Sequence, residues 1–137
     1  MPSNIFMKHR ASDNPPKLLV VEDDKGVARM LCFSLRMAGF DVTDVATGGE
    51  ALHILDQGTA DAVVLDLILP DGLGGAVLDR LRDLDQQGSF AWVAISALNI
   101  EEAARRYGPL EPKFLAKPFD PWVLVSMIED LMPTRRD

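Results

Sequence analysis

Two patterns of apolar and polar positions take turns along the chain from residue 17 onward. Short unbroken apolar runs, such as Ala62-Val63-Val64-Leu65, are typical of strands that are buried on both faces of a sheet. Longer segments with a helical period of apolar residues separate these runs. The pattern predicts strands at residues 17–21, 41–45, 62–66, 91–96 and about 113–116. It predicts helices at residues 25–38, 48–57, 74–84, from about 100 to 108, and from 121 to about 133.

Successive strand–helix units favour an α/β fold with a parallel five-stranded sheet that helices cover on both faces. The 137 residues suit one domain of this kind. Residues 1–16 are polar, contain Pro2, Pro15 and Pro16, and lack an apolar period. We therefore expect a loose N-terminal extension at 1–16, one domain at 17–133 and a short tail at 134–137.

Charge and composition argue against several function classes. The net charge is −7 and no stretch clusters Lys and Arg, so direct binding to nucleic acid is not expected. No apolar run is long enough for membrane insertion, and no segment resembles a secretory signal. The single cysteine, Cys32, cannot form an internal disulfide, which favours a cytoplasmic location. We expect Cys32 to be a small, semi-buried thiol.

Polar side chains stand at the ends of four predicted strands. Because the carboxyl ends of parallel strands meet at one edge of the sheet, these groups are expected to converge there. They are Glu22, Asp23 and Asp24 after the first strand, Asp66 at the end of the third, Ser96 at the end of the fourth, and Lys117 after the fifth. Acids in such positions also cap helices, and Asp24 is expected to do so.

Converging carboxylates indicate a cation site with phosphoryl chemistry. They repel one another, and Mg²⁺ suits them because it prefers hard oxygen ligands and binds phosphate. Zinc fits poorly, because His9 and His53 lack Cys or His neighbours at ligand spacing. An exposed carboxylate at Asp66 can attack phosphorus, while the metal and Lys117 neutralise charge. Ser96 can then donate a hydrogen bond to the product phosphoryl group.

From Lys17 to Met132 the chain resembles the response-regulator receiver domain of bacterial two-component signalling. The matching segments are Val20-Val21-Glu22-Asp23-Asp24, Leu65-Asp66-Leu67-Ile68-Leu69-Pro70-Asp71-Gly72, Ile95-Ser96-Ala97 and Lys117-Pro118-Phe119, in this order and spacing. The resemblance implies a flavodoxin-like, doubly wound (βα)5 fold with strand order 2-1-3-4-5. It also implies that Asp66 accepts a phosphoryl group from a phosphohistidine of a histidine kinase or a histidine phosphotransfer protein.

The resemblance further assigns a role to each site residue. By this assignment Mg²⁺ is held by Asp23, Asp66 and the backbone carbonyl of Ile68, and by Glu22 through water. The remaining roles are those of Ser96 as the switch hydroxyl, Phe114 as the switch aromatic, and Lys117 as the phosphoryl-binding lysine in a cis Lys117-Pro118 bond.

Several positions depart from the family pattern. Phe114 stands where tyrosine is common, and Leu73 stands where an acid is common, in a glycine-rich loop. The helix from about 100 to 108 is about one residue shorter than usual. Ile68 and Leu98 are aliphatic at the positions that should flank the phosphoryl group. We expect them to crowd the path of an attacking water, which would make the phosphorylated form long-lived.

Apolar residues on helices bear on partners. Phe33 and Met37 form either an apolar docking patch for the histidine donor or ordinary partly buried positions. Met30 on the same helix is expected in the core. Trp122 and Val125 belong either to the core or to the face of a homodimer.

These observations predict a stand-alone receiver that acts as a phosphorylation-dependent switch or relay. It would be a signalling protein with at most intrinsic autophosphatase activity, whose output passes to another protein because the chain ends soon after the last helix. A phosphohydrolase that uses an aspartyl-phosphate intermediate would need an acid two residues after Asp66, where the chain has Ile68. The remaining alternative is a receiver-like module that binds partners without phosphorylation. Such a module would normally lose part of the acid, hydroxyl and lysine set.

Overall fold

The computed structural model of the protein describes residues 14–88 and 90–132. The predicted tail at 134–137 and most of the predicted extension at 1–16 lie outside the described residues.

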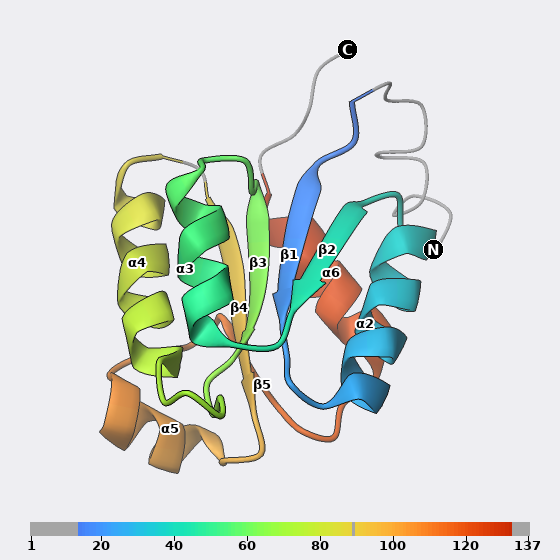
Figure 1. The fold of residues 1–137 in the computed structure, drawn as a ribbon. Helices are drawn as coiled ribbons and strands as arrows, with labels where there is room; N and C mark the ends of the chain where they lie inside the picture. Colours follow the sequence, from blue (N-terminus) through green and yellow to red (C-terminus); the bar gives the residue numbers. More distant parts are fainter. Residues whose placement is uncertain (1–13, 89, 133–137) are drawn as a thin grey trace.

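Over the described ranges, five parallel strands form one sheet in the order β2-β1-β3-β4-β5 (Figure 1). The strands are β1 Lys17–Val21, β2 Asp41–Val45, β3 Ala62–Asp66, β4 Ala91–Ser96 and β5 Phe114–Ala116. The helices are α2 Lys25–Met37, α3 Gly48–Asp56, α4 Gly74–Gln86, α5 Ile100–Tyr107 and α6 Pro121–Leu131. The predicted flavodoxin-like strand order is therefore confirmed.

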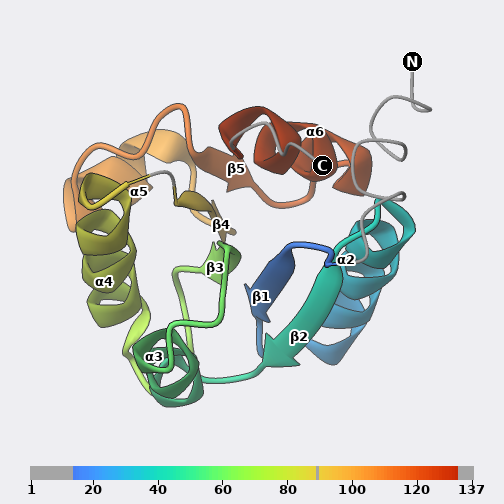
Figure 2. The same cartoon turned by 90° about the horizontal axis from the view of Figure 1, so that it is seen from above.

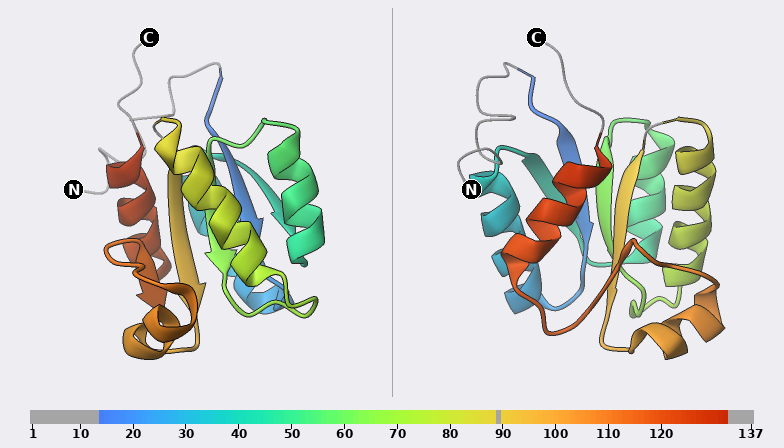
Figure 3. Two further views of the ribbon diagram at one scale, coloured as in Figure 1. Left: turned by 90° about the vertical axis from the view of Figure 1, so that its left-hand side faces the viewer. Right: turned by 180° about the vertical axis from the view of Figure 1, so that it is seen from behind.

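Helices cover both faces of the sheet: α2 and α6 lie on one face, and α3, α4 and α5 lie on the other (Figures 2 and 3). Successive residues of β3 alternate between the two cores, because side chains along a strand point to opposite faces. Ala62 and Val64 pack with α2 and α6, whereas Val63 and Leu65 pack with α3 and α4. All five residues of β3 are buried, as expected for a central parallel strand.

The predicted helix signals act where the sequence places them. Asn99 caps α5 by accepting a hydrogen bond from Glu102 N at 2.8 Å, and Asp120 caps α6, which begins with Pro121. Gly39 follows α2 with a φ of 100°, a conformation that favours glycine. The helix α4 extends two residues beyond its predicted end at 84, because the polar residues after Leu84 contain no helix breaker before Gly88.

One prediction about α2 is wrong. Met30 is 38 % exposed rather than part of the core, since it lies just outside the buried arc that contains Leu31 and Leu35. It stands beside Phe33 and Met37, which are 63 % and 51 % exposed. We call Met30, Phe33 and Met37 the α2 patch.

Other apolar positions divide clearly between core and surface. On α6, Val125 is buried in the core, whereas Trp122 is 39 % exposed. Cys32 is more deeply buried than expected, at 5 % exposure, and packs with α6 residues on one face of the sheet. Among the described helices, none combines the length and apolarity that crossing a membrane would require.

Candidate functional site

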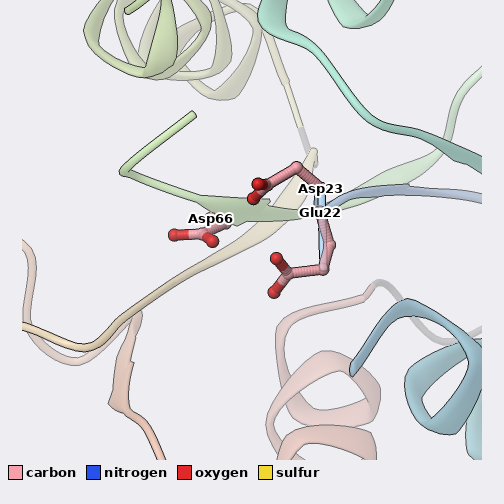
Figure 4. A group of neighbouring side chains, drawn as sticks. All are labelled: Glu22, Asp23 and Asp66. Atoms are coloured by element: carbon pink, nitrogen blue, oxygen red, sulfur yellow. The ribbon is translucent and has the colours of Figure 1, made fainter. Parts of the chain in front are cut away.

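Three carboxylates meet at the carboxyl edge of the two central strands, β1 and β3. Glu22 and Asp23 directly follow β1, and Asp66 is the last residue of β3. Each residue offers a carboxylate oxygen, and these atoms all lie within 4.8 Å of one another (Figure 4). Glu22 and Asp66 are buried, whereas Asp23 is exposed. The predicted convergence of acids is therefore present.

Asp66 is not the exposed carboxylate that the sequence suggested. It is only 4 % exposed, because the sheet continues past it: Asp66 pairs with Ile95, and Leu67 N donates to the Ile95 carbonyl at 3.0 Å. Ile68 N donates to Asp66 Oδ1 at 3.1 Å, which fixes the direction of the carboxylate. A carboxylate held in this way needs little reorganisation before it binds a cation or reacts.

Lys117 links two of the carboxylates. Its Nζ lies 2.7 Å from Glu22 Oε1 and 3.1 Å from Asp66 Oδ2. Its backbone N donates to the Ser96 carbonyl at 2.7 Å, so the segment after β5 is anchored to the end of β4. The predicted cis bond between Lys117 and Pro118 is present. The direct pairing of Lys117 with Glu22 was not predicted, since the sequence shows no partner for a residue 95 positions away.

Burial and pairing shift the pKa values of this pair. Burial raises the pKa of the Glu22 carboxyl, although the hydrogen bond from Lys117 opposes the shift. Burial alone would lower the pKa of the Lys117 ammonium, but the hydrogen bonds to Glu22 and Asp66 together raise it. Lys117 is therefore charged at neutral pH and offsets part of the negative charge of the cluster.

The backbone around Glu22 separates the roles of the neighbouring acids. Glu22 N donates to the Val45 carbonyl, and Asp24 N donates to Glu22 Oε2 at 3.1 Å. Asp24 Oδ1 accepts from Val27 N at 3.0 Å and caps α2, as predicted. The side chain of Asp24 is therefore committed to the helix, while Glu22 and Asp23 remain for the cluster.

Ser96 and Phe114 lie on the strands beside the cluster. Ser96 is fully buried, and its Oγ accepts a hydrogen bond from Leu98 N at 3.0 Å. Phe114 pairs with Ala94 in the sheet and packs, half-buried, against the core that also contacts Leu98. Phe114 thus lies beside the strand that carries Ser96 and is not a member of the acidic cluster.

The loop between β3 and α4 is tied to two other parts of the fold, and neither tie was predicted. The Asp71 carboxylate accepts hydrogen bonds from Gly49 N at 2.9 Å and Gly48 N at 3.2 Å, at the start of α3. The bond from Gly49, together with those from Gly48 and Leu73, lowers the pKa of the Asp71 carboxyl. An Asp-Gly pair indicates a turn, but it does not reveal a partner 22 residues away.

The second tie joins this loop to the end of α5. Tyr107 donates its hydroxyl to the Leu67 carbonyl at 3.4 Å. Tyr107 is the only tyrosine of the chain, a signal that the sequence offered without showing its partner.

The donor set fits a hard divalent cation. Three carboxylates supply oxygen ligands, and Lys117 leaves part of their negative charge uncompensated. A groove of about 750 Å³ lies beside Glu22 and Asp23 and extends along α2 and β2, where it is lined by Phe33 and Met37 of the α2 patch. The cluster can therefore be approached from the surface beside α2.

Comparisons with known proteins find one family over most of the chain. The family model for the response regulator receiver domain matches residues 18–129. The transcriptional regulatory protein PrrA of Mycobacterium tuberculosis is 33 % identical over 88 % of this chain and 51 % of its own length. The chain spans about half the length of the curated relatives it matches.

Two solved structures have a similar fold, and each alignment covers most of this chain and most of the other protein. A putative response regulator from Chloroflexus aurantiacus is 32 % identical, with a TM-score of 0.72 over 86 % of this chain and 98 % of its own. A response regulator receiver protein from Sinorhizobium medicae is 28 % identical, with a TM-score of 0.74 over 88 % of this chain and 96 % of its own.

Proposed function

The chain belongs to the response regulator receiver domain family, and on that premise we propose that Asp66 is the phosphoacceptor of a phosphorylation-dependent switch. The observation that carries this proposal is the position of Asp66. Its carboxylate is oriented by Ile68 N, contacted by Lys117 Nζ, and lies within 4.8 Å of the other acids of the cluster. The proposed nucleophile, the Lys117 ammonium and the acids proposed as metal ligands therefore lie close together, which supports the proposal.

The proposed step is phosphoryl transfer from a phosphohistidine of a histidine kinase or a histidine phosphotransfer protein. A carboxylate oxygen of Asp66 attacks phosphorus, and the new P–O bond forms as the P–N bond breaks. The imidazole leaves with the electron pair of the P–N bond and takes up a proton, while Asp66 becomes an acyl phosphate. Lys117, already bonded to Asp66 Oδ2, is placed to bond an oxygen of the transferring group.

We assign the metal site to Asp23, Asp66 and the Ile68 carbonyl, with Glu22 acting through water and holding Lys117. When bound there, Mg²⁺ would neutralise negative charge on the phosphoryl oxygens. Asp23 is the exposed member of the set, so it faces the side from which a hydrated cation would enter.

The proposed output is a shift between two conformations. The hydroxyl of Ser96 would exchange its bond with Leu98 N for a bond to a phosphoryl oxygen, and Phe114 would move into the space that is released. Phosphorylation favours the second conformation only through contacts that differ between the two. The surface near α5 and β5 would then change. We expect a protein partner to bind this changed surface and so to receive the signal.

The α2 patch supports a docking role for the histidine donor. Met30, Phe33 and Met37 are exposed together on α2, and Phe33 and Met37 line the groove that reaches Glu22 and Asp23. Exposed apolar side chains grouped in this way are typical of protein interaction sites. Trp122 and Val123 are also exposed, on α6, and they support a separate proposal of a homodimer through this helix.

The test is the intact mass of the protein after incubation with acetyl phosphate and Mg²⁺. We expect a gain of about 80 Da, the mass of one phosphoryl group, which requires Mg²⁺ and is absent in Asp66→Asn. Asp24→Asn, at the neighbouring cap position, is the matched control and should still gain the group. If neither acetyl phosphate nor phosphohistidine donors give an adduct, the protein is instead a binding module that works without phosphorylation.

A further inference from the structure

The peptide between Leu67 and Ile68 is held from both sides. Its N–H, on Ile68, donates to Asp66 Oδ1 at 3.1 Å. Its carbonyl, on Leu67, accepts the Tyr107 hydroxyl at 3.4 Å. This peptide is trans and planar, so its N–H and C=O point in opposite directions and turn together as one rigid unit. Asp66 and Tyr107 therefore contact opposite ends of the same rigid peptide unit.

Gly74 makes this approach possible, and Gly75 lies next to it under the Tyr107 ring. A Cβ on Gly74 would lie 2.0 Å from the Leu67 carbonyl oxygen, so only glycine allows α4 to begin this close to the loop. A Cβ on Gly75 would lie 3.7 Å from Tyr107 Cε1, so the ring lies over a residue without a side chain. The glycine at position 74 is thus explained by the close backbone contact that it permits.

Tyr107 is an important attachment of α5. Within α5, Ala103 is the fully buried residue, and Tyr107 and Ile100 pack half-buried against the core. A second tie lies just beyond the helix, where Arg82 Nη2 on α4 donates to the Pro109 carbonyl at 2.9 Å. A helix held by so few contacts responds readily to the loss of one of them.

We infer that Tyr107 is a positioning residue that couples Asp66 to α5 through the Leu67–Ile68 peptide. Its hydroxyl holds the carbonyl end of that peptide and so helps to fix the N–H that orients Asp66. A change at the Asp66 carboxylate tilts the peptide and moves the carbonyl away from, or toward, Tyr107. The signalling part of this inference rests on the proposed function, and the positioning part does not. Phe114 and Tyr107 pack against the same core, and of these two aromatic side chains Tyr107 is the one with a hydroxyl.

The positioning part is tested without any phosphate donor. We expect Tyr107→Phe, which keeps the ring, to accelerate hydrogen exchange of the Ile68 amide several-fold. Arg82→Ala is the matched control, because it removes the other tie to this segment without touching the Leu67 carbonyl, and should leave that amide unchanged. Equal exchange in Tyr107→Phe and the unmodified protein, or equal acceleration in both variants, would overturn the inference.

The coupling part uses the single tyrosine as a probe. With ring-labelled tyrosine, the protein gives one set of tyrosine NMR signals. We expect this set to shift in Asp66→Ala, which removes the acceptor of the Ile68 N–H, and to stay in place in Glu22→Gln, which changes charge in the same cluster. The set should also shift in samples whose mass shows the phosphoryl adduct. An adduct without a shift would overturn the coupling while leaving the proposed function intact. If no adduct forms, the Asp66→Ala spectrum tests the coupling alone, and an unshifted tyrosine signal in that variant would overturn it.

Discussion

Lys117 carries a structural role as well as the proposed chemical one. Its ammonium contacts Glu22, whose side chain is fully buried, and Asp66, whose side chain is 6 % exposed. Removing one partner of a buried ion pair leaves an uncompensated charge in the protein interior. The Lys117 ammonium, which would bind a phosphoryl group, therefore also neutralises charge on two buried carboxylates in the unphosphorylated protein.

We accordingly expect Lys117→Met to lower the free energy of unfolding by about 3 kcal/mol, measured by urea denaturation at pH 7. Adding Glu22→Gln to this variant should recover part of the loss, since the buried charge that Lys117 neutralised is then absent. Lys25→Met, an exposed lysine at the start of α2, is the control and should change stability little. A loss in Lys117→Met no larger than that in the control would contradict this account.

The aliphatic side chains of Ile68 and Leu98 lead us to expect a long lifetime of the phosphorylated form. Ile68 is 45 % exposed and Leu98 is half-buried, so each can place aliphatic surface near the approach to Asp66. We expect phosphorylated protein to lose its phosphoryl group more slowly than an Ile68→Asn, Leu98→Glu variant, in which polar groups can orient water. The decay of the 80 Da adduct with time measures both rates. Faster decay in the unmodified protein would reject the idea.

At the scale of elements, the contact between α4 and the end of β3 depends on one missing side chain. A Cβ on Gly74 would meet backbone atoms of Leu67 that cannot move aside, whereas a Cβ on Gly75 would meet the Tyr107 ring at ordinary distance. We expect Gly74→Ala to lower the free energy of unfolding by about 3 kcal/mol. Gly75→Ala, one residue further into the helix, should be neutral or slightly stabilising. Thermal denaturation of both variants compares them directly, and equal losses would contradict the packing argument.

The tie between Asp71 and α3 predicts a dependence of stability on pH. Hydrogen bonds from Gly49, Gly48 and Leu73 place the pKa of the folded Asp71 carboxyl below its ordinary value of 3.8. A depressed acid pKa stabilises the fold above the unfolded pKa, and this contribution disappears as the pH falls through the folded pKa. Asp71→Ala should therefore melt at a lower temperature than the unmodified protein at pH 6, with the gap narrowing toward pH 3. Asp79→Ala, on the exposed side of α4, is the control and should melt close to the unmodified protein at pH 6.

The elements and the convergence of the site were predictable, because both depend on local patterns. Apolar runs and caps such as Asn99 identify strands and helices, and the parallel order brings strand ends together. The pairings among side chains were not predictable. The partner of Asp71 depends on the path of a loop, and that of Tyr107 on how α5 packs beside the loop that follows β3. The misplacement of Met30 has a similar origin, since a small rotation of α2 decides which side of the buried arc meets solvent.

At the scale of the molecule, the site joins residues that lie far apart in the sequence. Glu22 follows the first strand, Asp66 ends the third and Lys117 follows the last, so binding at the cluster links all three. A ligand that binds only the folded state raises the free energy of unfolding, by about 2.7 kcal/mol at a concentration 100 times its dissociation constant. Mg²⁺ is therefore expected to stabilise the whole domain rather than one loop.

We expect Mg²⁺ to raise the midpoint of thermal unfolding, and a chelator to reverse the effect. Asp23→Ala should abolish the Mg²⁺-dependent rise, because it removes a carboxylate that we propose as a direct ligand of the metal. Asp24→Ala should keep the rise but start from a stability lower by about 1 kcal/mol, because it loses the cap of α2. If Asp24→Ala loses the rise and Asp23→Ala keeps it, the assignment of cap and ligand is reversed.

The pairing of Glu22 with Lys117 spans 95 residues, and this separation has a consequence for the newly made chain. A ribosome adds roughly 5–20 residues per second, so Glu22 leaves it roughly 5 to 20 s before Lys117 does. Until then the acids at the sheet edge lack their cation, and Lys117 cannot bond Asp66. A chain released before Lys117 is made thus lacks one group of the cluster, and under the proposed function it is not expected to accept a phosphoryl group as the complete chain does.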